Sequence, residues 1–106
     1  MATGKLAALD IAAGTNEQIY ECPADTFAVV TMSVCNRGSA TADIRISVAD
    51  TFPGTNADFI EFDTALPAKG VIERTGVVVA ASQKIIVRSS AASVNFVVYG
   101  IETQTV

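Results

Sequence analysis

Hydrophobic and polar residues alternate with a period of two along most of this chain, and no segment keeps the longer period of an amphipathic helix. The alternation is clearest over residues 41–48, where Asp43, Arg45 and Ser47 separate apolar residues. This pattern predicts a strand with one face in the core and the other in water or against a polar partner. Comparable runs bounded by turn residues predict about eight strands: 6–11, 17–22, 27–36, 41–48, 58–64, 71–80, 84–89 and 94–103.

Two of these segments, 27–36 and 94–103, are apolar on both faces. In the first, Phe27 and Val29 lie on one side and Val30 lies on the other, and the Phe27 side becomes polar farther along. A strand with two apolar faces is either covered on both sides or packed against another subunit. We therefore expect both segments to occupy central positions close to each other.

Turn residues connect the segments and interrupt one of them. The short turn at 36–39 predicts that 27–36 and 41–48 form a β-hairpin. Within 71–80, the pair Thr75–Gly76 predicts a bulge or bend.

Short strands that alternate with turns are typical of an all-β fold. We expect an antiparallel β-sandwich, either a jelly roll or an immunoglobulin-like sandwich, with no substantial helix. Periodicity does not distinguish these two folds, because they differ in strand connectivity. With 106 residues, the chain is expected to form a single domain spanning residues 1–106.

Composition argues against two classes of partner. The net charge is -4, with 7 Lys and Arg residues against 11 Asp and Glu, whereas nucleic-acid binding needs a basic surface. No apolar run approaches the roughly 20 residues of a membrane-spanning helix. The first residues contain one Lys and no apolar stretch of the kind found in secretory signals. We therefore expect neither a nucleic-acid nor a membrane partner.

The residues needed for common catalytic sites are missing from the sequence. There is no His, which excludes Ser-His-Asp and Cys-His sites and most zinc sites, and no glycine-rich phosphate-binding motif is present. Cys22 and Cys35 are expected at opposite ends of one strand, roughly 40 Å apart. That separation is far too large for a disulfide, so we expect two free thiols, as in a reducing cytoplasm. We expect no enzyme activity, no catalytic residues and no cofactor.

Three carboxylates lie close together in the sequence, at Asp58, Glu61 and Asp63. They could form a calcium site, because Ca²⁺ prefers oxygen ligands. They could instead be solvated charges on an edge strand, where they prevent unwanted strand pairing. We adopt the second interpretation and assign no metal site.

Phe52 stands in the longest loop, residues 50–57, among polar and turn-forming residues. Its ring either folds back over an open end of the core or projects to contact a partner. Tyr20 and Tyr99 are the other aromatic residues that we single out as partner contacts.

Four phrases of the sequence resemble small β-rich virion structural proteins of tailed bacteriophages. They are VCNRGS at 34–39 followed by IRISV at 44–48, DFIEFD at 58–63, GVIERTG at 70–76 and VVYGIE at 97–102. The resemblance extends from about residue 19 to residue 102. It implies a capsid decoration (cement) protein, or a component of the tail, neck or baseplate.

The resemblance also implies partners and a location. A decoration protein forms a homo-oligomer, for example a trimer at quasi-threefold positions, and binds the major capsid protein or another virion protein. It is located in the virion after assembly in the host cytoplasm, and residues 1–10 are a possible arm that becomes ordered on binding. The alternative is a host- or glycan-binding module that uses exposed aromatic residues such as Tyr20, Phe52 and Tyr99.

Overall fold

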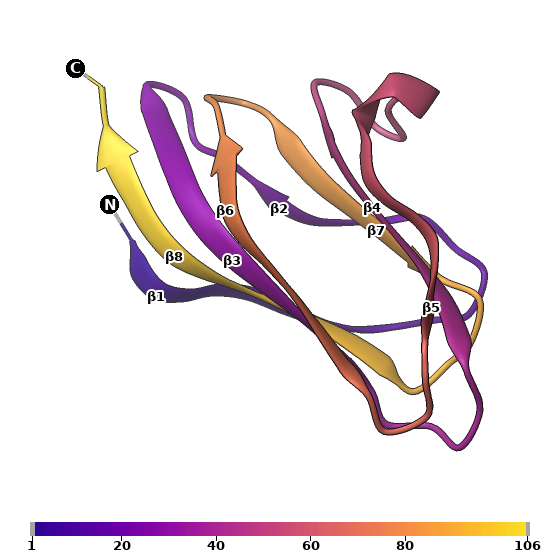
Figure 1. The fold of residues 1–106 in the computed structure, drawn as a ribbon. Coiled ribbons are helices and arrows are strands. Elements are labelled where there is room, and N and C mark those ends of the chain that lie inside the picture. Colours follow the sequence, from indigo (N-terminus) through magenta and orange to yellow (C-terminus); the bar gives the residue numbers. More distant parts are fainter. Residues whose placement is uncertain (1, 106) are drawn as a thin grey trace.

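Strands make up most of the chain in this computed structural model, which describes residues 2–105 (Figure 1). Eight strands are present in that part, as the alternation of residues predicts, and one short 3-10 turn, η1 (Asn56–Asp58), precedes the fifth. The strands are β1 (Thr3–Ile11), β2 (Glu17–Glu21), β3 (Thr26–Asn36), β4 (Ala42–Ala49), β5 (Phe59–Leu66), β6 (Val71–Val79), β7 (Lys84–Ser89) and β8 (Val94–Gln104).

The strands form two four-stranded antiparallel sheets, and the two layers are visible in Figure 1. Sheet A has the order β1-β8-β3-β6 and sheet B the order β2-β7-β4-β5. The predicted antiparallel β-sandwich is confirmed.

The strand connectivity distinguishes between the jelly roll and the immunoglobulin-like sandwich. β1 pairs with β8, β2 with β7, β3 with β6 and β4 with β5. The first four strands therefore pair with the last four in reverse order, as in one long hairpin that is folded into two layers. An immunoglobulin-like sandwich places several consecutive strands side by side, whereas among the strands of residues 2–105 only β4 and β5 are both consecutive and paired. The order is that of a jelly roll.

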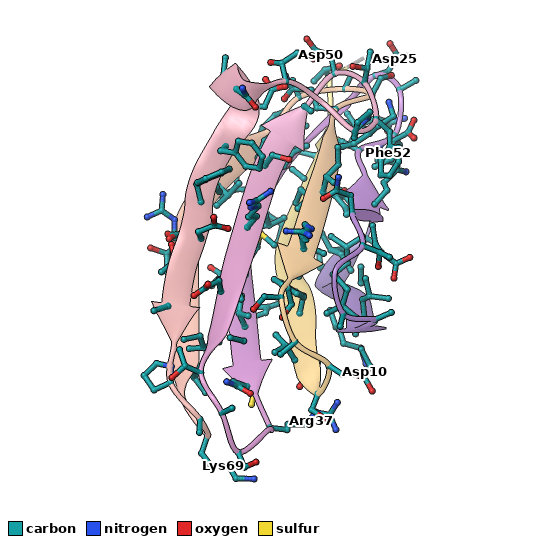
Figure 2. All side chains as sticks on the ribbon, turned by 90° about the vertical axis from the view of Figure 1, so that its right-hand side faces the viewer. Asp10, Asp25, Arg37, Asp50, Phe52 and Lys69 are labelled. Carbon is teal, nitrogen blue, oxygen red and sulfur yellow. The ribbon has the colours of Figure 1, made fainter. Side chains whose placement is uncertain are left out.

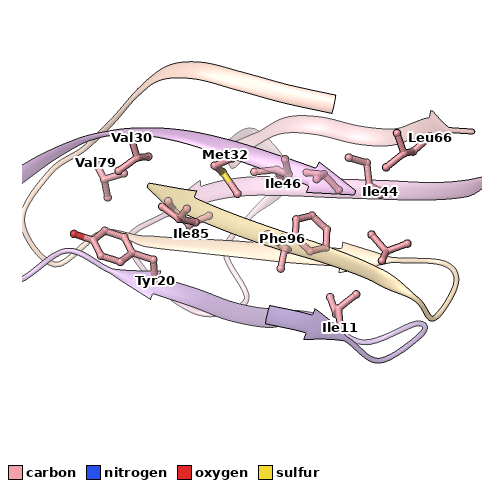
Figure 3. Packing of buried hydrophobic residues seen from close by; sticks show 14 of the residues in the cluster. Ile11, Tyr20, Val30, Met32, Ile44, Ile46, Leu66, Val79, Ile85 and Phe96 are labelled. Atoms are coloured by element: carbon pink, nitrogen blue, oxygen red, sulfur yellow. The ribbon is translucent and has the colours of Figure 1, made fainter. Parts of the chain in front are cut away.

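β3 and β8 occupy the two central positions of sheet A, as their two-sided apolar pattern predicts. They are paired without interruption from Thr26 opposite Gln104 to Asn36 opposite Val94. Alternate residues of both strands point into the sandwich, where Met32 and Phe96 of sheet A meet isoleucines of sheet B (Figure 3).

The predicted hairpin between 27–36 and 41–48 is wrong, because β3 belongs to sheet A and β4 to sheet B. The turn between them crosses from one layer to the other and is held by Asn36, which is only 1% exposed. The Asn36 side-chain amide donates to the carbonyl oxygens of Ala40 and Leu66, at 2.9 and 3.1 Å, and its side-chain oxygen accepts from the amide of Gly38 at 2.9 Å. The turn sequence alone did not show that this asparagine would be buried.

A further prediction concerns the local backbone of β6. The bulge at Thr75–Gly76 is confirmed: the register passes from Val30 opposite Val77 to Met32 opposite Arg74, which leaves one extra residue in β6. Gly76 has a φ of 68° there.

The possible arm at residues 1–10 lies mostly within sheet A, because Thr3–Ile11 is the edge strand β1 and pairs with β8. Met1 lies outside the described residues, and a binding role for the arm stays a prediction.

Candidate functional site

The outer surface of sheet A is the most apolar exposed surface of the described chain. Residues directly opposite each other on paired strands share a face, so the register assigns this surface, which we call the sheet A face. Six of the eight large hydrophobic residues that are exposed in the described structure lie on it: Phe27, Val29, Val71, Val78, Tyr99 and Ile101.

The register arranges these side chains in rows across the sheet. One row runs Thr3, Ile101, Val29 and Val78, from β1 to β6. Phe27 follows beyond it, opposite Thr103. Ile101 is 51% exposed and Val78 is 61% exposed. The apolar rows therefore lie at the end of sheet A where β8 ends and β1 begins (Figure 1).

The opposite end of the sheet A face is more polar. The row nearest that end runs Asp10, Asn95, Cys35 and Val71. Asp10 accepts from the Nη2 of Arg37 at 2.6 Å, and the Nε of Arg37 donates to the side-chain oxygen of Asn95 at 3.1 Å.

The middle of the sheet A face carries one cation and one anion. Lys5 lies opposite Tyr99, and the Tyr99 hydroxyl donates to Glu73 at 2.9 Å across β3. This hydrogen bond is the main reason why the pKa of Tyr99 is raised above its ordinary value. Together with Arg37 and Asp10 at the polar end, Lys5 and Glu73 make the side-chain charges of this face balance, although the whole chain carries -4.

The outer surface of sheet B is built differently, around Arg45. The Arg45 guanidinium contacts both carboxylate oxygens of Asp63, at 2.6 and 3.1 Å, and its central carbon lies 4.3 Å from the ring centroid of Phe62. A bulge in β5 brings Phe62 and Asp63 outward together, because Ile44 pairs with Thr64 while Ile46 pairs with Glu61. The hydrogen bond from Arg45 lowers the pKa of Asp63. The Phe62 ring, which is 56% exposed, therefore already has a cation of its own chain over it.

The three carboxylates that are close in sequence point in different directions. Asp58 closes the η1 turn by accepting from the amide of Thr55 at 2.7 Å. Glu61 points between the sheets, where it binds the Nε of Arg74 at 3.2 Å and the hydroxyl of Thr64 at 2.6 Å. Asp63 binds Arg45 on the outside. Among the described residues, no three His, Cys, Asp or Glu side chains come together as metal ligands would.

The aromatic residues singled out from the sequence have different environments. Tyr20 is 9% exposed in the core, so the expectation that its ring is exposed is wrong; its hydroxyl donates to the Glu102 carboxylate. Burial, followed by this hydrogen bond, raises the pKa of Tyr20. Phe52 is 50% exposed, at the end of the sandwich that also carries Asp25 and Asp50 (Figure 2). Tyr99 is 37% exposed on the sheet A face. Their roles as partner contacts stay predictions.

Both cysteines are free, as expected from their places in the sequence. Cys22 is buried, its thiol donates to the carbonyl oxygen of Thr26 at 3.4 Å, and burial is the main reason why its pKa is raised. Cys35 is partly exposed on the sheet A face.

Sequence reasoning found only part of the sheet A face. The two-sided apolar pattern of β3 and β8 indicated it, but Val71 and Val78 of β6 could not be assigned to it. Their membership depends on the pairing of β6 with β3, whose residues lie more than thirty positions away in the sequence, and the sequence carries no direct signal for that pairing.

No pocket opens among residues 2–105. None of the described residues form a helix long and apolar enough to cross a membrane. No family model matches this chain, and no curated protein matches it either.

Proposed function

We propose that this chain is a non-enzymatic structural protein of a bacteriophage virion, which acts as a capsid decoration protein. In this proposal it forms a homo-oligomer and stabilises the shell by covering contacts between capsid subunits. The observation that carries the proposal is the sheet A face, because large contiguous apolar surfaces on small proteins mark sites of protein association.

The virion context comes from the resemblance of four phrases in the sequence to phage virion proteins. Two of those phrases, 34–39 and 97–102, include parts of β3 and β8, the central strands of the sheet A face. Jelly rolls occur in viral capsid proteins and also in lectins. The fold is therefore compatible with both a shell protein and a glycan-binding module, and the surface is what favours the shell protein.

The surface favours assembly because its apolar residues come from paired, regular strands. Val29 and Ile101 face each other on the two central strands, and Val78 continues their row on β6. A glycan site would instead need exposed aromatic rings arranged together. Phe52 and Tyr99 belong to different parts of the molecule, a loop beside sheet B and the sheet A face.

Immunogold labelling of purified particles tests the proposal, with an antibody raised against the purified chain. Label distributed over the heads is the expected result. Label confined to the tail, neck or baseplate would replace the decoration role with that of a tail component. Particles that carry no label, while denatured particle protein also fails to react on a blot, would refute a virion role altogether.

A further inference from the structure

The sheet A face has an area, a balance of charge and an order of side-chain rows that suit packing against a second copy of itself. We propose that two copies of this chain pair face to face through the sheet A face, around a two-fold axis parallel to the strands. This inference rests on the proposed homo-oligomer and names the surface through which it forms.

The size of the surface is adequate for a specific contact. Four strands spaced about 4.8 Å apart, and a rise of about 3.3 Å per residue from Phe27 to Cys35, give a face of roughly 19 by 26 Å. Two copies would therefore bury about 1,000 Å² in total if the face is treated as flat, and protruding side chains add to this area. The total reaches the size expected of a biological interface.

The order of the rows selects the axis. Sheets that pack face to face keep their strands within about 30° of each other. If the axis runs parallel to the strands, each row meets the same row of the second copy, so Ile101 packs against Val29 of the second copy. An axis perpendicular to the strands would instead place the apolar row on the polar row of Asp10 and Asn95.

The charges also suit a second copy. Among residues 2–105, Lys5 forms no ion pair, and Glu73 is held only by the hydroxyl of Tyr99. The parallel axis places β1 of one copy over β6 of the other, where Lys5 lies one row from Glu73 of the second copy. Symmetry then provides two such ion pairs. The balanced charge of this face lets two chains of net charge -4 approach each other there with little repulsion.

Sedimentation of the purified chain over a range of concentrations tests the pair directly. The wild type is expected to sediment as a dimer that dissociates on dilution. Ile101→Lys should raise the dissociation constant at least 100-fold, because two lysines would be buried without partners. Phe52→Lys is the matched control, since Phe52 is 50% exposed and Ile101 is 51% exposed. The control should associate like the wild type, and circular dichroism verifies that both variants are folded.

A charge exchange tests the register of the pair. Lys5→Glu and Glu73→Lys should each weaken association, whereas the double variant should restore it. A wild type that stays monomeric, a trimer, or an Ile101→Lys variant that associates like the wild type would overturn the proposal. So would a double variant that is no better than the single ones.

Cys35 gives an independent measure of the same geometry. With sheets about 10 Å apart and a sideways offset of one strand, the two Cys35 Cα atoms of the pair lie about 11 Å apart. A short bismaleimide should therefore cross-link the wild type into a covalent dimer but leave Cys35→Ser uncross-linked, since Cys22 is buried. A dimer that is not cross-linked would show that a different surface associates.

These experiments use the chain alone, so they are independent of the particle labelling. Labelled heads together with a monomeric chain would refute only the face-to-face pair. A dimer with the expected variants, combined with unlabelled particles, would refute only the virion role.

Discussion

Replacement of Gly100 by alanine should destabilise the whole sandwich, because β8 comes very close to β3 at this residue. A methyl carbon at Gly100 would lie 2.1 Å from the carbonyl oxygen of Val29 and 2.8 Å from the Cα of Val30. Both atoms belong to the backbone of the central neighbouring strand, so no side-chain rotation can relieve the contact. β3 and β8 would have to separate locally.

The size of the effect follows from that separation. Contacts below 3.0 Å are essentially never made by real Cβ atoms, so the Val29 oxygen must move away by about 0.9 Å. A ladder hydrogen bond of about 2.9 Å cannot survive such a displacement. Two lost ladder bonds at about 1 kcal/mol each, with about 2 kcal/mol of overpacking, give a loss of about 4 kcal/mol. For a domain of this size, that loss lowers Tm by about 20 °C.

Thermal and urea unfolding of Gly100→Ala measure this loss. Gly76→Ala is the control, because both glycines have a positive φ, 159° at Gly100 and 68° at Gly76. A methyl group at Gly76 would meet no atom within 4 Å. The control should cost only the backbone term of about 1–2 kcal/mol. If Gly100→Ala proves no less stable than Gly76→Ala, the close approach of β8 to β3 is wrong.

Three further predictions concern ionisable side chains. Since the pKa of Tyr20 is raised above its ordinary 10.0, its contribution to stability is complete below about pH 10 and is lost above it, so Tyr20→Phe should make the free energy of unfolding fall less steeply there. Because Arg45 lowers the pKa of Asp63, that contribution is present above about pH 3.8 and is lost as the pH falls further; Arg45→Gln should therefore flatten the loss of stability between pH 4 and pH 2, measured by circular dichroism. At concentrations low enough to dissociate the pair, a thiol reagent should react quickly with Cys35 and slowly with Cys22 in the folded chain, and with both in urea; two fast thiols before unfolding would contradict the burial of Cys22.

The elements of this fold follow from the sequence more readily than their arrangement does. Strands, the bulge at Gly76 and the central positions of β3 and β8 are properties of local alternation and turn residues. The hairpin predicted for 27–36 and 41–48 failed because a turn sequence does not reveal whether the chain stays in one sheet. That outcome depends on the burial of Asn36, whose amide binds carbonyl groups of Ala40 and of the distant Leu66.

The candidate site was less predictable, for a related reason. A side chain on the inward or outward face is fixed by the parity of its position, but its neighbours across a sheet depend on pairing between distant strands. Tyr20 departs from the parity rule, because a register shift in β2 pairs Gln18 with Ile86 and Tyr20 with Ile85. Its ring is therefore buried, and its hydroxyl donates to Glu102, far away in the sequence. The sheet A face illustrates the dependence on distant pairing, since it unites strands from both ends and the middle of the sequence.

The core and the sheet A face share the same two strands, and this connection bears on how assembly could be favourable. In β3, Val30 packs inside the sandwich while its neighbour Val29 points outward, and in β8, Val98 and Ile101 are divided in the same way. The packing of the core therefore fixes the spacing of the outer side chains already in the single, unassociated chain. Branched side chains such as Val29 and Ile101 have few rotamers to lose. A surface whose side chains are already ordered loses little conformational entropy on association. An interface of only about 1,000 Å² is therefore sufficient to hold two copies together in the proposed pair.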